Sequence, residues 1–441
     1  MSHTHIHPYS ATRNSLQQHH IIEVPGDKSI SHRALLFGAL ANGVTRVSSL
    51  LEAQDVNSTR SCLIQLGAEI SRDGSDWIVQ GRGAAGFKAP TDSLNCGNSG
   101  TTIRLLMGIL AGQPFEAHLH GDASLSKRPM KRIATPLRQM GAQIQLTDDQ
   151  TPPVQMTGTR PLHPIHYSLP VASAQLKSAV LLAGLAAEGM TQLTGHTHSR
   201  DHTERLLKHF GVHVEATVQR GNPNASLSIQ GGQTLSAANV NVPGDISSAA
   251  FWLGLGALIP CGKIEIQNVL LNPTRTGILS LLQKMGARIQ FEITSTEPEP
   301  VGTIQVEHSD LRAIDILPPE VPTLIDELPL IAILATFAAG TTTVRGAEEL
   351  RVKETDRLEA IAKNLRAMGG EIELYPDGFA IHGPQTLRGA AIDSFGDHRI
   401  AMAFSVAALK AQGSSEIRES ECVAISYPTF YETLNELTGS R

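Results

Sequence analysis

Residues 24–33 read VPGDKSISHR, and an apolar run rich in Ala and Leu follows directly and ends at Leu40. The Pro-Gly pair interrupts regular structure, the two serines are favourable first residues of a helix, and the apolar run is typical of the helix itself. Lys28 and Arg33 therefore flank a predicted helix N-terminus, where backbone N–H groups and the positive end of the helix dipole also lie. This arrangement favours the binding of a phosphate or a carboxylate. The alternative is a solvated helix start with incidental charges.

The same signature occurs a second time at residues 242–245, which read VPGD. Two serines and an apolar run from Ala249 to Leu258 follow this copy as well. The second copy lacks the lysine and the arginine of the first. The two copies should therefore be equivalent in structure but unequal in chemistry.

Two sets of glycines recur along the chain at intervals of roughly 73 residues. In one set an apolar helix pattern ends at a glycine that opens a β-like run, and in the other a glycine ends a helix before a strand. Glycine readily adopts the left-handed conformation that stops a helix. Although such helix ends occur in any α/β protein, the near-equal spacing predicts a β-α-β-α-β-β unit repeated six times. The first set is Gly43, Gly112, Gly189, Gly262, Gly340 and Gly413, and the second is Gly67, Gly141, Gly211, Gly286 and Gly369.

The predicted fold class is therefore α/β, with two similar domains of three β-α-β-α-β-β repeats each. We expect one domain to comprise residues 27–244 and the other to comprise residues 21–26 plus 245–441, with residues 1–20 as a disordered His-rich leader. The chain should cross between the domains at the two VPGD segments. If the helix N-termini of each domain point toward the other domain, anionic ligands would collect in the interdomain cleft, which is the predicted active site.

Composition sets bounds on location and partners. The chain has 441 residues, of which 41% are hydrophobic, and no apolar run reaches the ~18 residues that a membrane span needs, so no membrane association is expected. The net charge of −6 argues against nucleic acid as a partner. Cys62, Cys96, Cys261 and Cys422 are scattered without metal-ligand spacing, so we expect neither a metal site nor disulfides, and a reducing cytoplasm. The leader lacks the apolar core of a signal peptide, and weak metal binding by its histidines is the alternative to a purely disordered leader.

Several further segments place charged or small polar residues at predicted helix starts, where each alone also fits an ordinary cap or turn. Residues 95–104, NCGNSGTTIR, expose backbone N–H groups to an oxyanion. Asp326 precedes an apolar helix and is either its N-cap or, among cations, a general base. In residues 350–358, LRVKETDRL, a helix would put Lys353 and Arg357 on one face, whereas the alternative is a solvated, salt-bridged helix. The remaining segments are KRPM at 127–130, with Pro129 expected in a first helical turn, VASAQLKS at 171–178, and GDHRIAMAF at 396–404.

Taken in order, these segments closely resemble the 5-enolpyruvylshikimate-3-phosphate synthase family, in its divergent bacterial branch. The resemblance extends over residues 24–435. It implies a pair of inverse α/β domains and transfer of the enolpyruvyl group of phosphoenolpyruvate to the 5-hydroxyl of shikimate 3-phosphate, with release of phosphate. It also implies that no metal or organic cofactor takes part, that the protein is a monomer, and that glyphosate competes for the phosphoenolpyruvate site.

The resemblance further implies a role for particular residues. Asp326 would accept the proton of the attacking hydroxyl, and Glu354 with Lys28 would handle the proton at the methylene carbon. Shikimate 3-phosphate would be held by Lys28, Ser29, Arg33, Ser173, Gln175, Asp326 and Lys353. Phosphoenolpyruvate would be surrounded by Lys28, Gly100, Arg128, Gln175, Arg357 and Arg399.

The chain departs from the commoner family pattern at Ala174, at Ile425 and at Arg200, which replace a serine, a lysine and a hydroxyl residue. The nearest alternative is the related enzyme that transfers enolpyruvyl to UDP-N-acetylglucosamine. That branch has Lys-Asn where this chain has Lys28-Ser29, and a cysteine where this chain has Ala123. A non-catalytic anion-binding protein is the second alternative, and it would need no carboxylates such as Asp326 and Glu354.

Overall fold

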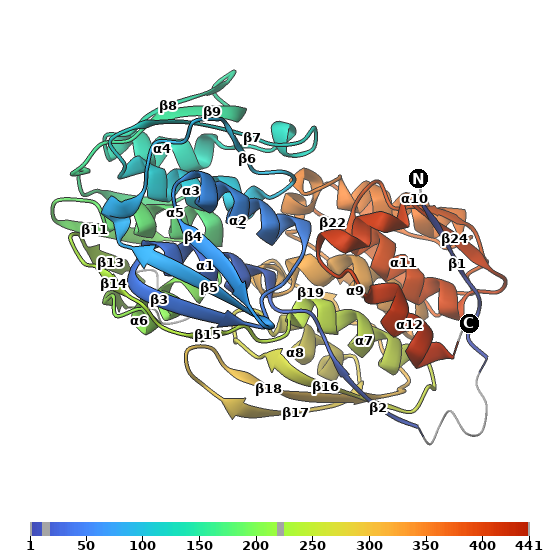
Figure 1. Ribbon diagram of the computed structural model, residues 1–441. Helices are drawn as coiled ribbons and strands as arrows, with labels where there is room; N and C mark the ends of the chain where they lie inside the picture. The colour runs from blue at the N-terminus through green and yellow to red at the C-terminus, as the bar shows by residue number, and fades with distance from the viewer. Residues whose placement is uncertain (1, 11–17, 218–224, 440–441) are drawn as a thin grey trace. The chain divides into compact units, whose positions relative to one another are not determined.

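The computed structural model describes residues 2–10, 18–217 and 225–439. The chain divides into two compact units, which are called unit 1 and unit 2 below. Unit 2 is residues 26–242, and unit 1 combines residues 1–25 with residues 243–441. Figure 1 labels the helices and strands of both units.

Unit 2 contains three sheets, and each sheet belongs to one repeat of strands and helices. The sheet orders are β14-β3-β5-β4, with β15 also paired to β3, then β6-β7-β9-β8 and β10-β11-β13-β12. In each sheet the first two strands run parallel, as do β15 and β3, and the remaining pairs are antiparallel. The elements are α1 (Lys28–Leu40), β3 (Ala41–Ser48), α2 (Gln54–Gln65), β4 (Glu69–Asp73), β5 (Asp76–Arg82), β6 (Leu94–Asn95), α3 (Gly100–Ala111), β7 (Glu116–His120), α4 (Lys131–Gln139), β8 (Gln143–Thr147), β9 (Thr151–Thr157), β10 (His166–Leu169), α5 (Ala174–Gly184), β11 (Met190–Gly195), α6 (His202–His209), β12 (Val214–Ala216), β13 (Leu227–Gln230), β14 (Leu235–Ser236) and β15 (Val240–Asn241).

Unit 1 repeats this architecture with one variation. Its sheet orders are β17-β18-β16-β2, β19-β20-β22-β21 and the shorter β1-β24-β23. The predicted α/β fold of two units with three repeats each is confirmed. The elements are β1 (His3–Ile6), β2 (His19–Glu23), α7 (Ile246–Leu258), β16 (Lys263–Leu270), α8 (Gly277–Lys284), β17 (Arg288–Ser295), β18 (Val301–Glu307), β19 (Asp315–Ile316), α9 (Leu328–Phe337), β20 (Gly340–Val344), α10 (Arg357–Ala367), β21 (Glu373–Tyr375), β22 (Gly378–Gly383), β23 (Ala391–Asp393), α11 (His398–Lys410), β24 (Ser415–Arg418) and α12 (Phe430–Thr438).

The chain crosses from one unit to the other at each VPGD segment. β2 precedes α1 in the chain, but it pairs in parallel with β16 of unit 1. β14 and β15 precede α7, but they pair in parallel with β3 of unit 2. Each VPGD segment is therefore the point where the chain leaves the sheet of one unit and starts the first helix of the other.

The N-terminal segment forms strands where we expected a disordered leader. β1 pairs antiparallel with β24, from His3 opposite Arg418 to Ile6 opposite Ser415, and Ile6 is only 5% exposed. The sixth repeat contributes only two strands to its sheet, so β24 would otherwise present an unpaired edge. Backbone pairing and the burial of Ile6 outweigh the polar composition. The leader prediction is therefore wrong for residues 3–6 and 19–20, and residues 11–17 lie outside the described part.

The first helix of each repeat is buried almost all round. All thirteen residues of α7 are buried, and α1, α3, α5, α9 and α11 have apolar residues on every face. A helix of this kind needs neighbours on all sides, so it lies inside its unit. The second helices, such as α2 and α10, alternate buried and exposed residues and cover the outside.

Aspartate, and not serine, caps the first helix after each VPGD segment. The Asp27 side chain accepts a hydrogen bond from the backbone N of Ile30 at 2.9 Å, and α1 begins at Lys28. Asp245 caps α7 in the same way through the N of Ser247 at 2.8 Å. The expected start at the serines is wrong because the aspartate satisfies the orphan N–H groups earlier in the chain.

The two sets of recurring glycines do different work. The second set follows the C-cap residue of a helix, and its φ angles lie between 79° and 108°, as a left-handed helix end requires. The first set lies at the strand that follows the helix, as Gly43 does in β3 and Gly340 does at the start of β20. Gly112 differs from the others in its set because its φ angle is −89°.

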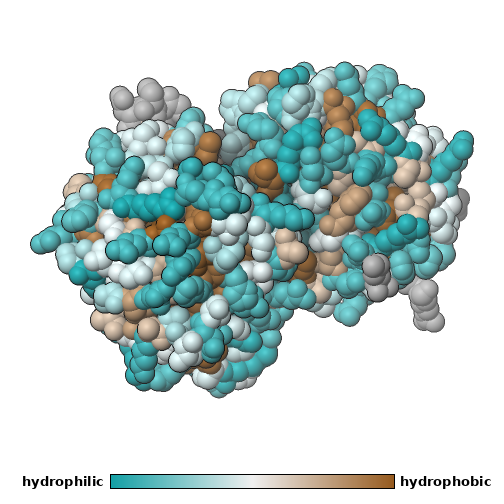
Figure 2. Space-filling model, turned by 90° about the horizontal axis from the view of Figure 1, so that it is seen from above, coloured by the Kyte–Doolittle hydropathy of each residue, from teal (hydrophilic) through white to brown (hydrophobic). Residues whose placement is uncertain are grey.

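On the face drawn in Figure 2, hydrophilic residues predominate and apolar residues form small groups. Within the described residues, no helix combines the length and the apolar character that crossing a membrane would require.

Gly108 should be intolerant of a side chain. α3 and α5 pack so closely that a Cβ at Gly108 would lie 2.4 Å from the backbone O of Ala179 and 2.7 Å from its Cα. Because backbone cannot move aside cheaply, we expect Gly108→Ala to lower the free energy of unfolding by about 1–3 kcal/mol. Hydrogen exchange measured by mass spectrometry should show faster exchange in α3 and α5, with peptides of unit 1 as internal reference.

Ser61→Ala, an exposed position on α2, is the control and should change stability by less than about 0.5 kcal/mol. If hydrogen exchange in Gly108→Ala were as slow as in the parent, α3 and α5 could move apart without a loss of stability, and the prediction would be wrong.

Candidate active site

The N-terminus of α1 carries a lysine that is held by a buried carboxylate. The Nζ atom of Lys28 lies 3.1 Å from Oδ2 of Asp55, which comes from the first turn of α2. The Lys28 side chain keeps about a fifth of its surface exposed, whereas Asp55 is buried. Lys28 is therefore a positioned cation at the positive end of a helix dipole, as the sequence predicted.

Arg33 lies one turn further along α1 and is only 3% exposed. Its Nε donates to Oγ1 of Thr203 at 2.8 Å, and its Nη2 donates to Oγ of Ser178 at 2.9 Å. Its Nη1 donates to the backbone O of Ser29 at 3.0 Å. Arg33 thus links α1 to α5 and α6 through hydrogen bonds. It therefore has a structural role in addition to any contact with a ligand.

A second cationic group lies at the N-terminus of α3. Arg128 donates from Nη2 to Oδ1 of Asn98 at 2.6 Å and to Oγ of Ser124 at 3.2 Å. A Cβ built at Gly100 would lie 3.4 Å from Nη1 of Arg128 and 2.8 Å from Nη1 of Arg104. The first residue of α3 therefore lies beside two guanidinium groups, and this combination favours an anion.

Arg104 ties this group to α5. Its Nη1 donates to Oε1 of Gln175 at 2.6 Å, and its Nη2 donates to the backbone O of Pro129 at 3.2 Å. Gln175 in turn donates to Oγ1 of Thr101 at 2.9 Å. The structure thus brings Gly100, Arg128 and Gln175 together, and it does so through Arg104, a residue to which the sequence analysis gave no role.

Of the helix starts expected in unit 2, the cap at Ser173 is confirmed and the place of Pro129 is wrong. Ser173 is the N-cap of α5 and accepts a hydrogen bond from the N of Leu176 at 3.4 Å. Pro129 lies outside the first turn of its helix, because α4 begins at Lys131. Lys177, which is buried, pairs with Oε1 of Glu204 at 2.6 Å and is therefore a structural cation.

In unit 1 the charged residues gather around Arg357, whose side chain is 1% exposed. Its Nε lies 2.7 Å from Oδ2 of Asp397, its Nη2 lies 2.6 Å from Oε2 of Glu354, and its Nη1 lies 3.5 Å from Oδ1 of Asp326. Burial by itself would lower the pKa of Arg357, but the carboxylates of Asp397, Glu354 and Asp326 outweigh it and raise the pKa above its ordinary value. The guanidinium is therefore a permanent charge enclosed by three carboxylates.

Asp326 receives cations on two sides. Besides Arg357, the Nζ atom of Lys353 lies 3.7 Å from its Oδ1, and Arg399 donates from Nη1 to its backbone O at 3.1 Å. Its side chain keeps 12% of its surface exposed. A partly exposed carboxylate that is oriented by cations can act as a general base toward a bound hydroxyl.

The segment that carries Lys353 and Glu354 is not the helix that we expected. Residues 348–352 form a short 3-10 helix, and α10 begins only at Arg357, with Asp356 as its N-cap. The Asp356 side chain accepts from the N of Glu359 at 3.2 Å, so it fixes the helix start at this point. The predicted i,i+4 pair is therefore wrong, although both cations still reach Asp326.

The second VPGD copy supports the residue next to Asp326. Arg275 donates to Oγ of Ser247 at 2.8 Å and to Oδ1 of Asp245 at 3.1 Å, and Ser247 donates to Oε1 of the buried Glu327. Burial raises the pKa of Glu327, Arg399 opposes that shift, and the neighbouring Asp326 adds to it. In place of a lysine, this copy thus positions a buried carboxyl group next to the candidate base.

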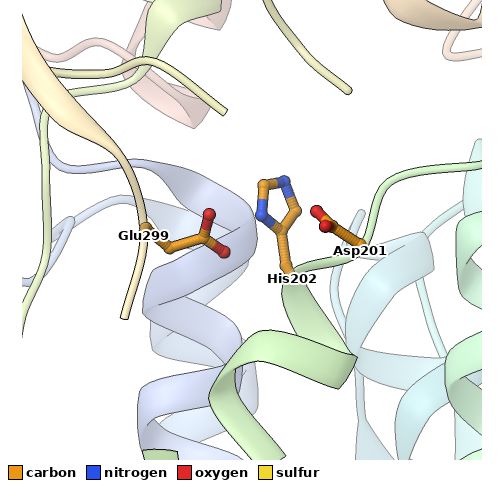
Figure 3. A group of neighbouring side chains, drawn as sticks. All are labelled: Asp201, His202 and Glu299. Atoms are coloured by element: carbon orange, nitrogen blue, oxygen red, sulfur yellow. The ribbon is translucent and has the colours of Figure 1, made fainter. Parts of the chain in front are cut away.

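Asp201 and His202 lie at the start of α6 (Figure 3). Asp201 pairs with Nε of Arg205 at 2.8 Å. Glu299, also labelled in Figure 3, belongs to unit 1, where Nδ2 of Asn272 donates to its Oε2 at 2.7 Å. Two potential ligands from unit 2 are fewer than a protein metal site uses, so we assign no metal to them.

Residues in the charged groups that the sequence analysis left without a role are Asp55, Arg104, Asp397 and Glu327. Arg104 and Glu327 had a detectable signal, since each is a charge within or beside an otherwise apolar helix pattern. Asp397 precedes α11 and had the signature of an N-cap, and the structure shows it capping Arg399 N at 2.8 Å. Nothing in the sequence marked Asp55 as the partner of Lys28.

Each unit thus presents arginine and lysine side chains with backbone N–H groups at the start of buried helices, and unit 1 adds carboxylates. This is the constellation of an enzyme that acts on small phosphorylated or carboxylated substrates.

Comparison with known proteins identifies the class. The profile of the family described as EPSP synthase (3-phosphoshikimate 1-carboxyvinyltransferase) matches residues 13–434. The 3-phosphoshikimate 1-carboxyvinyltransferase of Bacillus cytotoxicus is 50% identical over 418 residues, which cover 94% of this chain and 97% of the relative. That of Bacillus subtilis is 48% identical over 423 residues, which cover 95% and 97%. The solved EPSP synthase from Acinetobacter baumannii has a TM-score of 0.85 at 42% identity and covers 99% of this chain and 98% of its own.

The chain belongs to the EPSP synthase family and has its two-domain fold. It is therefore an enzyme, a transferase of the shikimate pathway, and the resemblance noted in the sequence is confirmed.

His32 should make stability depend on pH. Burial, followed by the charges of Lys28 and Arg33, holds the pKa of His32 well below its ordinary value. Below pH ~6.5 the unfolded chain binds a proton at this residue while the native protein does not, so the free energy of unfolding falls as the pH is lowered. We expect the stability of the parent relative to His32→Asn to be constant above pH ~7 and to decline between pH ~6.5 and 5.

Denaturant titrations of both proteins across this range measure the effect. His213→Asn, at a residue whose side chain is 78% exposed, is the matched substitution at the surface. A parent-minus-variant difference for His32 that stays constant from pH 5 to 8 would mean that the imidazole titrates normally.

Proposed function

We propose that the chain transfers the enolpyruvyl group of phosphoenolpyruvate to the 5-hydroxyl of shikimate 3-phosphate and releases inorganic phosphate. The observation that supports this most strongly is the 50% identity to a protein named 3-phosphoshikimate 1-carboxyvinyltransferase, over 97% of that relative. Both substrates carry a phosphate and a carboxylate, which accounts for cations in a protein whose net charge is −6.

The assignment of residues to the two substrates is the one that the family resemblance implies. The residues assigned to shikimate 3-phosphate are Lys28, Ser29, Arg33, Ser173, Gln175, Asp326 and Lys353. Those assigned to phosphoenolpyruvate are Lys28, Gly100, Arg128, Gln175, Arg357 and Arg399.

The proposed reaction is an addition followed by an elimination. Asp326 accepts the proton of the 5-hydroxyl, the oxygen bonds to C2 of phosphoenolpyruvate, and Glu354 with Lys28 delivers a proton to C3. The result is a tetrahedral adduct whose charge the arginines stabilise. A proton then leaves C3, the C–O bond to phosphate breaks, and the enol ether and inorganic phosphate are released.

Asp326→Asn tests the assignment of the base. The amide keeps the size of the side chain but cannot accept the hydroxyl proton, so we expect kcat to fall by about 10²–10⁴-fold. Binding of shikimate 3-phosphate, measured by calorimetry, should remain within several-fold of the parent. Asp310→Asn, at an exposed carboxylate of the same unit, should leave both quantities unchanged. Turnover of Asp326→Asn near the parental rate would remove Asp326 from the mechanism.

Gly100→Ala tests the assignment of Gly100 to the phosphoenolpyruvate site. The added Cβ would lie 2.8 Å from Nη1 of Arg104, so this guanidinium must shift, and with it the hydrogen bond that holds Gln175. We expect the inhibition constant of glyphosate to rise more than the KM for phosphoenolpyruvate, because the longer inhibitor needs more of the space beside Gly100. Steady-state kinetics of both proteins measure the two constants.

The KM for shikimate 3-phosphate is measured alongside, because Gln175 is assigned to both substrates. An equal rise in the two constants, or none in either, would show that Gly100 does not border the inhibitor.

The alternative acceptor, UDP-N-acetylglucosamine, finds no support in the relatives reported above, since those transferases are named for 3-phosphoshikimate. We further propose that the enzyme works as a monomer in a reducing cytoplasm. In support of the reducing location, all four cysteines are buried and none forms a disulfide.

A further inference from the structure

A chain of buried hydrogen bonds joins the first three helices of unit 2. Nδ1 of His32 in α1 lies 2.7 Å from Oγ1 of Thr59 in α2, and Oγ1 of Thr59 lies 2.7 Å from Oγ1 of Thr102 in α3. Oγ1 of Thr102 lies 2.8 Å from Oγ of Ser99, the N-cap of α3. All four side chains are fully buried, so no solvent competes for these bonds.

This series of hydrogen bonds has a preferred direction from donor to acceptor, because each hydroxyl has only one proton. The Thr102 hydroxyl donates to Oγ of Ser99 at 2.8 Å, and the backbone O of Asp55 is more distant at 3.4 Å, whereas in the pair with Thr59 either hydroxyl could be the donor. If Thr102 donates to Ser99, then Thr59 must donate to Thr102. The last bond then needs a donor, and only an N–H on Nδ1 of His32 can supply it.

The reverse direction would place the imidazole proton on Nε2. That atom is buried and has no hydrogen-bond partner among the residues that the structure describes. An orphaned buried N–H is rarer than an orphaned acceptor, so the reverse direction is disfavoured. A doubly protonated imidazole would leave the same N–H orphaned and would place a third cation beside Lys28 and Arg33.

We propose that His32, as the neutral Nδ1–H tautomer, is a positioning residue for the residues at the start of α3 that are assigned to phosphoenolpyruvate. Through Thr59 and Thr102 it fixes Ser99, which precedes Gly100 and caps the helix start beside Arg128. This inference rests on the proposed function for the identity of the ligand, whereas the tautomer itself does not.

Helix α2 contributes Thr59 to this series of hydrogen bonds, between α1 and α3. The series therefore bears on residues assigned to both substrates. α2 carries Thr59 and also Asp55, which holds Lys28. The hydrogen-bonded chain therefore sets α3 against the same helix that orients the lysine of α1. Loss of a hydroxyl should disturb the helix start at Gly100 more than the ion pair at Lys28, because the ion pair has its own contact.

The tautomer can be measured in the full-length protein without any substrate. Nitrogen-15 NMR of protein labelled at histidine distinguishes Nδ1–H, Nε2–H and charged imidazole, and the resonance that disappears in His32→Asn is that of His32. We expect the neutral Nδ1–H form from pH 6 to 8. Observation of the Nε2–H or the charged form would overturn the proposal, whatever reaction the enzyme catalyses.

The positioning role has a separate kinetic test. Thr59→Val keeps the shape but breaks the chain, and we expect the KM for phosphoenolpyruvate to rise about five- to tenfold, the ratio that corresponds to one well-ordered hydrogen bond. The KM for shikimate 3-phosphate should rise less. Thr59→Ser restores the hydroxyl and should restore most of the phosphoenolpyruvate KM.

Equal KM values in the Val and Ser variants, or equal rises for both substrates, would overturn the positioning role. If Thr59→Val does not fold, Thr102→Val and Thr102→Ser break and restore the chain at the next link and decide the question in the same way. Absence of all enzyme activity in the parent would instead reject the proposed function and leave the NMR result standing.

Discussion

The start of a buried helix is the feature on which the rest of this structure depends. Six helices lie inside the two units with apolar residues on nearly every face, and each must satisfy its first N–H groups without help from solvent. Asp27, Ser99, Ser173, Asp245 and Asp397 cap five of them with a side-chain oxygen. The remaining N–H groups and the helix dipole give these positions a preference for anions, so the functional side chains are found where the fold needs polar groups in any case.

Repetition of one unit six times then allows the copies to diverge without loss of the fold. After Asp27 the chain places Lys28, which pairs with Asp55, whereas after Asp245 it places Ile246 and recruits Arg275 from the segment before α8. Both solutions neutralise charge at a buried helix start. Only the first leaves a lysine partly exposed, while the second directs Ser247 to Glu327, the neighbour of Asp326. The same local problem is thus solved once in favour of binding and once in favour of supporting a carboxylate.

The sequence allowed prediction of the repeat, because Gly67 and its equivalents must end helices with positive φ and because buried helices are apolar throughout. Pairing between distant segments was less accessible. A crossing of the chain at the first VPGD segment was expected, but no local pattern shows that the partner strand of β2 is β16. β1 was missed because three of its four residues are polar, and Arg104 was given no role although a charge inside an apolar helix pattern marks it. The assumed helix at Lys353 failed because Asp356 is a stronger helix start than the residues before it.

The charged side chains of unit 1 and unit 2 differ in their partners. Under the proposed function, this difference bears on which unit binds the anionic parts of the substrates and which one transfers protons. In unit 1, the cations Lys353, Arg357 and Arg399 form ion pairs with the carboxylates of Asp326, Glu354, Asp397 and Glu327. In unit 2, Lys28, Arg33, Arg104 and Arg128 have one buried carboxylate, Asp55, as an ion-pair partner of Lys28, and several of their other contacts are hydroxyls, amides or carbonyls. Under the proposed function, these oriented cations at the starts of helices are the groups of unit 2 that suit the phosphate and carboxylate of the substrates. Under the proposed function, unit 1 is suited to proton transfer, because its carboxylates are oriented by cationic neighbours.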